Sequence, residues 1–202
     1  MEERVWVERA QQGDQAAFAH LVAVYQGPVY NLAYRMLGSA QDAEDAAQET
    51  FLRAYVQFDT YQPERRFASW LLSIAAHYCI DQLRRRRFTW LPLDDLPFLD
   101  WIGSGEAEPE GAALQREERD QVRQLLDYLP PNYRLVIVLR YWYDLSCQEI
   151  ADVAGLTESA VKTRLYRARE MLAQGLTAPA TTALPARPGE AMEEARSVLS
   201  NC

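Results

Sequence analysis

Clustered cationic side chains near the end of the chain have the types and spacing needed to hold a polyanion. Within eight positions the sequence places Lys162, Arg164, Arg167 and Arg169, and the nearest acids, Glu158 and Glu170, flank this cluster. Lys and Arg neutralise nucleic-acid phosphates and can pair with the O6 and N7 atoms of guanine. The 202-residue chain has a formal net charge of −8. The basic segment is therefore a local feature of an acidic protein.

Helix start and stop signals surround this basic segment. Ser146 and Glu149 have the spacing of a capping box, which predicts a short helix from about 147 to 153. Gly155 permits a turn after that helix, and Thr157 can cap the next one. Two helices joined by so short a turn predict a helix-turn-helix.

The second of these helices has one apolar and one basic face. At 100° per residue its core-facing stripe consists of Val161, Leu165, Ala168 and Leu172. Outside that stripe lie the candidate DNA-contacting residues, Ser159, Lys162, Thr163, Arg164, Tyr166, Arg167 and Arg169. Such a helix fits the major groove of B-DNA. A solvated face on an ordinary bundle helix is the alternative, and the agreement of turn, caps and cations favours DNA.

Catalytic and metal-binding patterns are missing from the sequence. It has no G-x-S-x-G, P-loop, glycine-rich dinucleotide turn or H-E-x-x-H, and only His20 and His77 could serve as histidine bases. Cys79, Cys147 and Cys202 are too few and too scattered for a disulfide framework. We therefore expect no catalytic residue, no bound metal and no cofactor.

The periodicity predicts an all-α protein with two small helical domains. Residues 1–88 form the first domain, with breaks expected at Gly27-Pro28, Gly38 and Pro63. An acidic linker containing proline and glycine follows at 89–114, then a second helical domain at 115–174 and a tail at 175–202 that we expect to be disordered. Apolar runs are too short to span a bilayer and the N-terminus has no export signal, so we expect a cytoplasmic protein.

An acidic helix is predicted in the first domain, in the segment SAQDAEDAAQETFLRAYVQFD at 39–59. Ser39 is its N-cap candidate, and a buried stripe is expected at Ala47, Phe51, Ala54, Tyr55 and Phe58. Its first half is acidic and polar, with Asp42, Glu44, Asp45, Gln48 and Glu49. Acids early in a helix also stabilise its dipole, which is the ordinary explanation for such a cluster.

A second helix closes the first domain, in RRFASWLLSIAAHYCIDQLRRRR at 65–87. One of its faces carries Phe67, Trp70, Leu71, Ile74 and Tyr78, and the helix ends with the arginines Arg84, Arg85, Arg86 and Arg87. A basic helix end is itself favourable for the dipole, and aromatic residues at this spacing favour core packing over base stacking.

Together these segments resemble a known family. The stretches DAEDAAQETFLRAY, FASWLLSIAAHYCIDQLRRRR and LPPNYRLVIVLRYWYDLSCQEIADVAGLTESAVKTRLYRARE are similar to regions 2 and 4 of the extracytoplasmic-function (ECF) group of bacterial sigma factors. The resemblance spans roughly residues 4–174, and its motifs occur in the family's order around an acidic linker.

The resemblance implies a subunit that binds core RNA polymerase and directs it to promoter DNA. The helix with Asp42, Glu44, Asp45, Gln48 and Glu49 would lie against the clamp of the polymerase β′ subunit, with further contacts to other subunits. Trp70, His77 and Arg84 to Arg87 would recognise and melt the −10 element, and the helix at 158–173 would read the −35 element. An anti-sigma factor is a further implied partner, and direct membrane insertion of this chain is not expected.

His77 is a departure from the family pattern. Family members often carry asparagine there, and histidine keeps a donor and an acceptor but changes their reach. The base preference at the −10 element is therefore open. A stand-alone helix-turn-helix regulator is the alternative function, and it would have no use for the acidic helix of the first domain.

Overall fold

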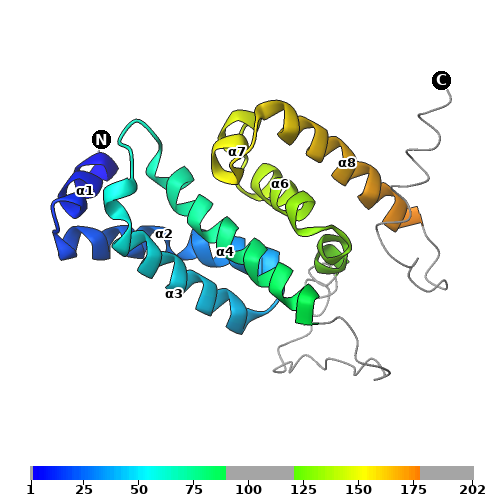
Figure 1. Cartoon of the computed structure of the whole chain (residues 1–202), viewed down its shortest axis with the longest axis horizontal. Coiled ribbons are helices and arrows are strands. Elements are labelled where there is room, and N and C mark those ends of the chain that lie inside the picture. The colour runs from blue at the N-terminus through cyan, green and yellow to red at the C-terminus, as the bar shows by residue number, and fades with distance from the viewer. Residues whose placement is uncertain (1, 90–120, 178–202) are drawn as a thin grey trace, which may run out of the picture.

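All regular structure in the described part of the chain is helical. The computed structural model describes residues 2–89 and 121–177. Along the chain it contains α1 (Glu2–Gln11), α2 (Gln15–Leu37), α3 (Ala40–Val56), the short 3₁₀ helix η1 (Phe58–Thr60), α4 (Phe67–Thr89), a helical stretch at 121–128, α6 (Pro131–Trp142), α7 (Cys147–Ala154) and α8 (Glu158–Thr177) (Figure 1). The predicted all-α class is confirmed.

The predicted break at Gly27-Pro28 is wrong. Both residues lie inside α2, which the Asp14 side chain caps by accepting hydrogen bonds from the amides of Ala16 and Ala17 at 2.9 and 3.1 Å. Proline removes one intrahelical hydrogen bond. The helix nevertheless continues, because Val29 and Leu32 directly beyond the proline are fully buried and hold it against the core. The breaks expected at Gly38 and Pro63 do separate helices.

The predicted linker at 89–114 lies outside the described residues except for Thr89, the last residue of α4. The tail was expected to begin at residue 175, but α8 continues to Thr177. The remainder of the tail is also outside the described residues.

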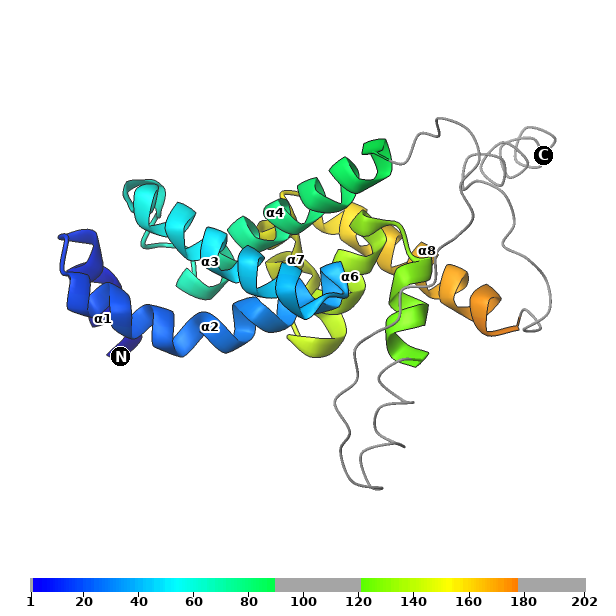
Figure 2. The same ribbon diagram turned by 90° about the horizontal axis from the view of Figure 1, so that it is seen from below.

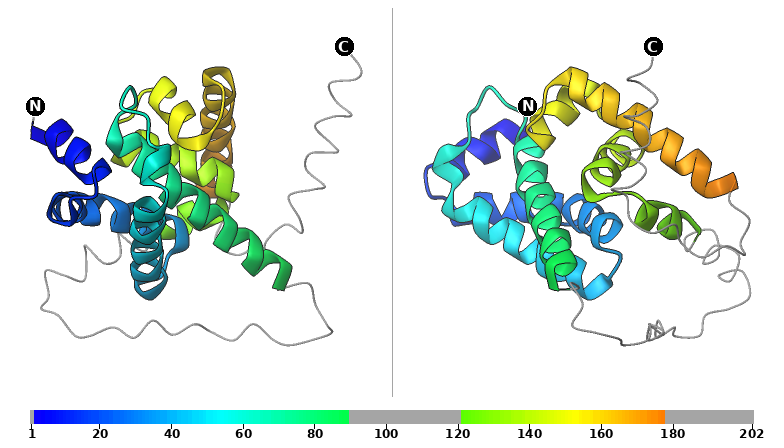
Figure 3. Two further views of the ribbon diagram at one scale, coloured as in Figure 1. Left: turned by 60° about the vertical axis from the view of Figure 1, so that its left-hand side comes forward. Right: turned by 45° about the vertical axis from the view of Figure 1, so that its right-hand side comes forward.

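Two helical units pack against each other. Helices α1 to α4 form the first unit and α6 to α8 the second, and α6 lies between α4 and α8 (Figure 1). Figure 2 shows α1 and α8 at opposite ends of the molecule. Figure 3 shows the second unit lying along one side of the first, and α7 packs against α4 while α6 packs against α2 and α4.

One hydrophobic core joins the two units. Leu32, Met36 and Leu71 of the first unit and Leu139 and Ile150 of the second are fully buried in the same cluster. Apolar burial of this kind is the main favourable contribution to packing, so the two units stabilise each other. Neither described range holds a helix long and apolar enough to cross a membrane.

Candidate nucleic-acid interface

The helix-turn-helix forms as its sequence signals predict. Ser146 Oγ accepts a hydrogen bond from the Glu149 amide at 3.2 Å, and Glu149 Oε2 accepts one from the Ser146 amide at 2.9 Å. This capping box starts α7, which ends at Gly155 with a φ of 64°, a left-handed conformation that suits glycine. Thr157 Oγ1 then accepts from the Ala160 amide at 3.2 Å at the start of α8.

The orientation predicted for α8 is also found. Val161, Leu165 and Ala168 are buried and Leu172 is half-buried. Ser159, Lys162, Thr163, Tyr166, Arg167 and Arg169 are exposed, and Arg164 is half-buried. Tyr166 is 62% exposed although it is large and partly apolar. We call these seven residues the reading face of α8.

Neighbouring side chains hold part of the reading face in place. Lys162 Nζ lies 2.6 Å from Glu158 Oε1, and this hydrogen bond raises the pKa of Lys162. Thr163 Oγ1 donates to the Ser159 carbonyl at 3.0 Å, and Arg169 Nε donates to the Tyr141 hydroxyl at 3.0 Å. The flanking acid Glu158, which the spacing placed outside the cationic cluster, thus pairs with a member of it. A bound phosphate would have to compete with that acid for Lys162.

Trp70 lies at the edge of an aromatic cluster. Its ring centroid is 5.5 Å from that of Phe58, 5.4 Å from Tyr61 and 5.7 Å from Phe67. The predicted packing role of these aromatics is therefore found, and Trp70 remains half-buried at the surface of α4.

His77 is exposed on α4, and its ring has a defined tautomer. Nδ1 lies 2.6 Å from the Ser73 carbonyl oxygen. Because a carbonyl can only accept, Nδ1 must carry the proton, and Nε2 of the neutral ring is then an acceptor. Nε2 points toward the turn of the helix-turn-helix, since a Cβ added to Gly155 would lie 3.9 Å from it.

Two residues predicted to contact different partners are paired with each other. Arg86 Nη2 lies 2.6 Å from Asp42 Oδ1. Partial burial opposes ionisation of Asp42, but hydrogen bonds from Arg86 and Ser39 lower the pKa of its carboxyl below the ordinary value. Arg84 and Arg85 are exposed near this pair, while the side chain of Arg87 is outside the described part.

An acidic and apolar surface covers the outer side of α3. Glu44, Asp45 and Gln48 are exposed, and the half-buried Glu49 pairs with Arg53 at 2.7 Å. Leu52 and Val56, one turn apart, are 63% and 82% exposed. We call Glu44, Asp45, Gln48, Glu49, Leu52 and Val56 the α3 face. Leu52 and Val56 thus add a small exposed apolar patch to the acidic side chains of α3.

The apolar half of the α3 face was missed from the sequence, and the predicted buried stripe is right only in part. Ala54 and Phe58 are buried, Ala47 and Phe51 are half-buried, and Tyr55 is wrong. Tyr55 is 52% exposed and touches the edge of Phe18 at a ring distance of 5.1 Å. The fully buried positions of α3 are Ala43, Ala46, Thr50 and Ala54. Small side chains allow α3 to lie close to its neighbours, so the large residues turn outward. The i, i+4 pair Leu52 and Val56 was the available sequence signal.

Family models match both units. The model for sigma-70 region 2 matches residues 21–89, and the model for sigma-70 region 4 matches residues 119–172. The chain is 37% identical over 176 residues to the ECF RNA polymerase sigma factor SigW of Bacillus subtilis (strain 168), covering 84% of this chain and 94% of that protein. It is 35% identical over 181 residues to the ECF RNA polymerase sigma-E factor of Escherichia coli (strain K12), covering 84% and 92%.

Solved structures with the same fold include the complex of CnrH with the cytosolic domain of CnrY. The TM-score is 0.65 at 30% identity, covering 87% of this chain and 97% of the other. A complex of RpoE with the anti-sigma factor NepR from Bartonella quintana has a TM-score of 0.57 at 19% identity, covering 79% and 96%, and shows the fold alone.

Proposed function

We propose how the surfaces of this chain divide promoter recognition and polymerase binding, given that the chain belongs to the ECF group of sigma-70 factors. As a member of that group it is a transcription initiation factor that directs RNA polymerase to promoters. The reading face of α8 contacts the −35 element. Trp70, His77 and the arginines of α4 contact the −10 element. The α3 face binds core polymerase.

The reading face supports the −35 assignment most directly. A helix-turn-helix presents its second helix to the major groove, and α8 is that helix. Lys162 and Arg167 are both exposed on it, and such side chains can pair with guanine or with phosphate. A buried apolar stripe fixes the rotation of α8, so the cations cannot turn toward the core.

Charge complementarity supports the assignment of the α3 face. Its carboxylates occupy the first half of α3 and its exposed apolar side chains the second half, an arrangement suited to a basic partner surface with its own apolar contact. The stand-alone regulator is not supported by the comparisons and leaves this face without a partner. An anti-sigma factor is a further partner that we propose, and the similar CnrH, at 30% identity, is itself in complex with a second protein, the cytosolic domain of CnrY.

With this function the protein would act in the cytoplasm, where RNA polymerase is found. It would catalyse no reaction itself. The polymerase holds both DNA-contacting units at once, so the second promoter contact becomes effectively intramolecular. Unstacked −10 bases would be captured on α4, at a cost of a few kcal/mol for each flipped base.

The test is in-vitro transcription of fragmented genomic DNA by core polymerase with and without the protein, followed by mapping of RNA 5′ ends. New start sites that share two upstream elements are expected. Glu49→Lys should abolish core binding, because it reverses the charge of one α3-face carboxylate and places a second cation beside Arg53. Glu8→Lys on α1 is the matched control. Equal core affinity for both variants would contradict the assignment of the α3 face.

A further inference from the structure

We propose that Asp42 is a positioning residue for promoter binding, which holds the guanidinium of Arg86 in place for DNA at the end of α4. The family resemblance assigned these two residues to different partners, Asp42 to core polymerase and Arg86 to the −10 element. The proposal rests on the assignment of α4 to the −10 element. It also removes Asp42 from the residues that bind polymerase.

The carboxylate of Asp42 lies toward α4 and away from the exposed acids of α3. Its Oδ1 atom is 2.6 Å from Arg86 Nη2, and its side chain is 32% exposed. The next acids along the chain, Glu44 and Asp45, are exposed. Successive helix positions point in different directions, so Asp42 can adjoin the α3 face in sequence and still lie on the α4 side. An incoming basic surface would therefore find the Asp42 carboxylate already paired.

A second contact fixes α3 against α4. The Arg53 guanidinium lies over the Tyr78 ring of α4 at 5.1 Å, and the Tyr78 hydroxyl accepts a hydrogen bond from Gln82 Nε2 at 2.9 Å. The two helices run antiparallel, since the start of α3 meets the end of α4 and the end of α3 meets its middle. The Asp42 carboxylate thus offers Arg86 a partner at a fixed position.

Without this carboxylate the Arg86 side chain would have other partners close by. Arg86 lies in the last turn of α4, where the final carbonyls have no intrahelical partners. Arginine side chains near a helix C-terminus can bond to such carbonyls. Pairing with Asp42 directs the guanidinium sideways toward α3, and its side chain stays 44% exposed. A guanidinium has five N–H donors, so those that Asp42 does not use remain for a phosphate or a base edge.

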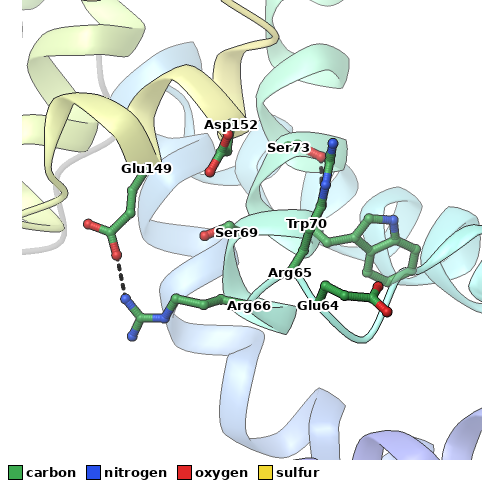
Figure 4. Close-up of a pocket in the computed structure, with 8 residues that line it drawn as sticks. All are labelled: Glu64, Arg65, Arg66, Ser69, Trp70, Ser73, Glu149 and Asp152. Carbon is green, nitrogen blue, oxygen red and sulfur yellow. Dashed lines mark hydrogen bonds and ion pairs between the residues drawn. The ribbon is translucent and has the colours of Figure 1, made fainter. Parts of the chain in front are cut away.

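The source of the carboxylate distinguishes Arg86 from Arg66, which lies next to the start of α4. Arg66 Nη1 pairs with Glu149 Oε1, and Glu149 belongs to α7 in the second unit (Figure 4). The partner of Arg86 comes from α3, in the same unit as α4. The Asp42–Arg86 pair therefore does not depend on how the two units pack, and it can persist while the first unit binds polymerase and DNA.

A carboxylate beside an arginine could instead weaken DNA binding by competing with phosphate. The two effects have opposite signs when the carboxylate is neutralised. Loss of positioning weakens promoter binding, because a flexible side chain must then be ordered during binding, whereas loss of competition strengthens it. The sequence keeps the end of α4 cationic in either case, through Arg84, Arg85 and Arg87.

The experiment measures binding of the full chain, assembled with core polymerase, to a labelled promoter fragment identified by the transcription mapping. Asp42→Asn removes the charge and keeps the size of the side chain. We expect promoter binding to weaken about fourfold, the cost of ordering one arginine side chain, while core affinity stays unchanged. Asp81→Asn is the matched control, because it removes the same charge from an exposed site on α4. This control should bind the promoter at least as tightly as wild type.

A double-mutant cycle with Arg86→Gln tests whether Asp42 acts through Arg86. In the Arg86→Gln background, Asp42→Asn should have no further effect on promoter binding. A further loss in that background, tighter binding by Asp42→Asn alone, an equal loss in Asp81→Asn or a lower core affinity of Asp42→Asn would overturn the proposal.

The same cycle separates failure of the positioning role from failure of the −10 assignment. If Arg86→Gln leaves promoter binding unchanged, the assignment of Arg86 to the −10 element is wrong and the proposal falls with it. If Arg86→Gln weakens promoter binding and Asp42→Asn does not, the positioning role alone is wrong.

Discussion

Arg134 joins the two units through a buried contact, and replacing it with methionine should weaken the packing between them. Arg134 on α6 is 6% exposed, donates to the Met36 carbonyl at 2.6 Å and pairs with Asp127 at 2.9 Å. Met36 lies in the last turn of α2, where carbonyls lack intrahelical partners. Arg134 therefore supplies a hydrogen bond that α2 cannot make by itself.

The expected loss follows from these contacts. A hydrogen bond from a charged donor contributes about 1.5–3 kcal/mol. Asp127 is half-exposed, so its carboxylate stays solvated when Arg134 is removed. Loss of this ion pair therefore adds little to the destabilisation. Methionine fills most of the volume of the Arg134 side chain. Because a buried cation is costly, its removal offsets part of the free energy lost with the hydrogen bond. We expect Arg134→Met to lower the free energy of unfolding by about 2 kcal/mol.

Urea unfolding measures the total loss, and hydrogen exchange followed by mass spectrometry locates it. Arg140→Met is the matched control, because Arg140 lies on the same helix and donates to Leu145 of the same unit at 2.8 Å. Arg134→Met should accelerate exchange in both α2 and α6, whereas Arg140→Met should affect only the second unit. A loss below about 0.5 kcal/mol, or equal effects of both variants on α2, would refute this account of the contact.

Three further predictions concern the helix-turn-helix and the thiols. Arg167→Ala should cost about 1–3 kcal/mol at one −35 base pair in binding to a promoter series, and an equal loss on every sequence would indicate a phosphate contact instead. Ser146→Ala should lower the free energy of unfolding by about 1 kcal/mol at neutral pH through loss of the cap. Hydrogen bonds from Ser146 and Arg66 lower the pKa of Glu149, so the stabilising contribution of its carboxylate is present at neutral pH and is lost as the pH falls through that lowered pKa. In urea unfolding at acidic pH the difference between Ser146→Ala and wild type should therefore shrink but persist, because the hydrogen bond from the Glu149 amide to Ser146 Oγ does not titrate. Burial raises the pKa of the Cys79 thiol to about 12, so in native-state labelling Cys79 should react far more slowly than the half-buried Cys147, and equal rates would contradict its burial.

Local signals in the sequence predicted much of the second unit. The capping box at Ser146, the glycine turn at Gly155 and the apolar stripe of α8 are all found where they were expected. Each depends on residues within about one or two helical turns, and such local preferences agree here with the tertiary fold. The break at Gly27-Pro28 failed for the opposite reason, because burial of Val29 and Leu32 outweighs one missing hydrogen bond.

The sequence by itself therefore determined the helical class, the two units, the caps and the basic side of α8. Only the tertiary structure decided that Asp42 pairs with Arg86, that Tyr55 turns outward, and that α7 lies on α4 with Glu149 against Arg66. Periodicity specifies which side of a helix is apolar, but it does not specify which distant helix meets that side. Contacts such as Arg134 to Met36 join residues 98 positions apart, and they are fixed by the packing of the whole core.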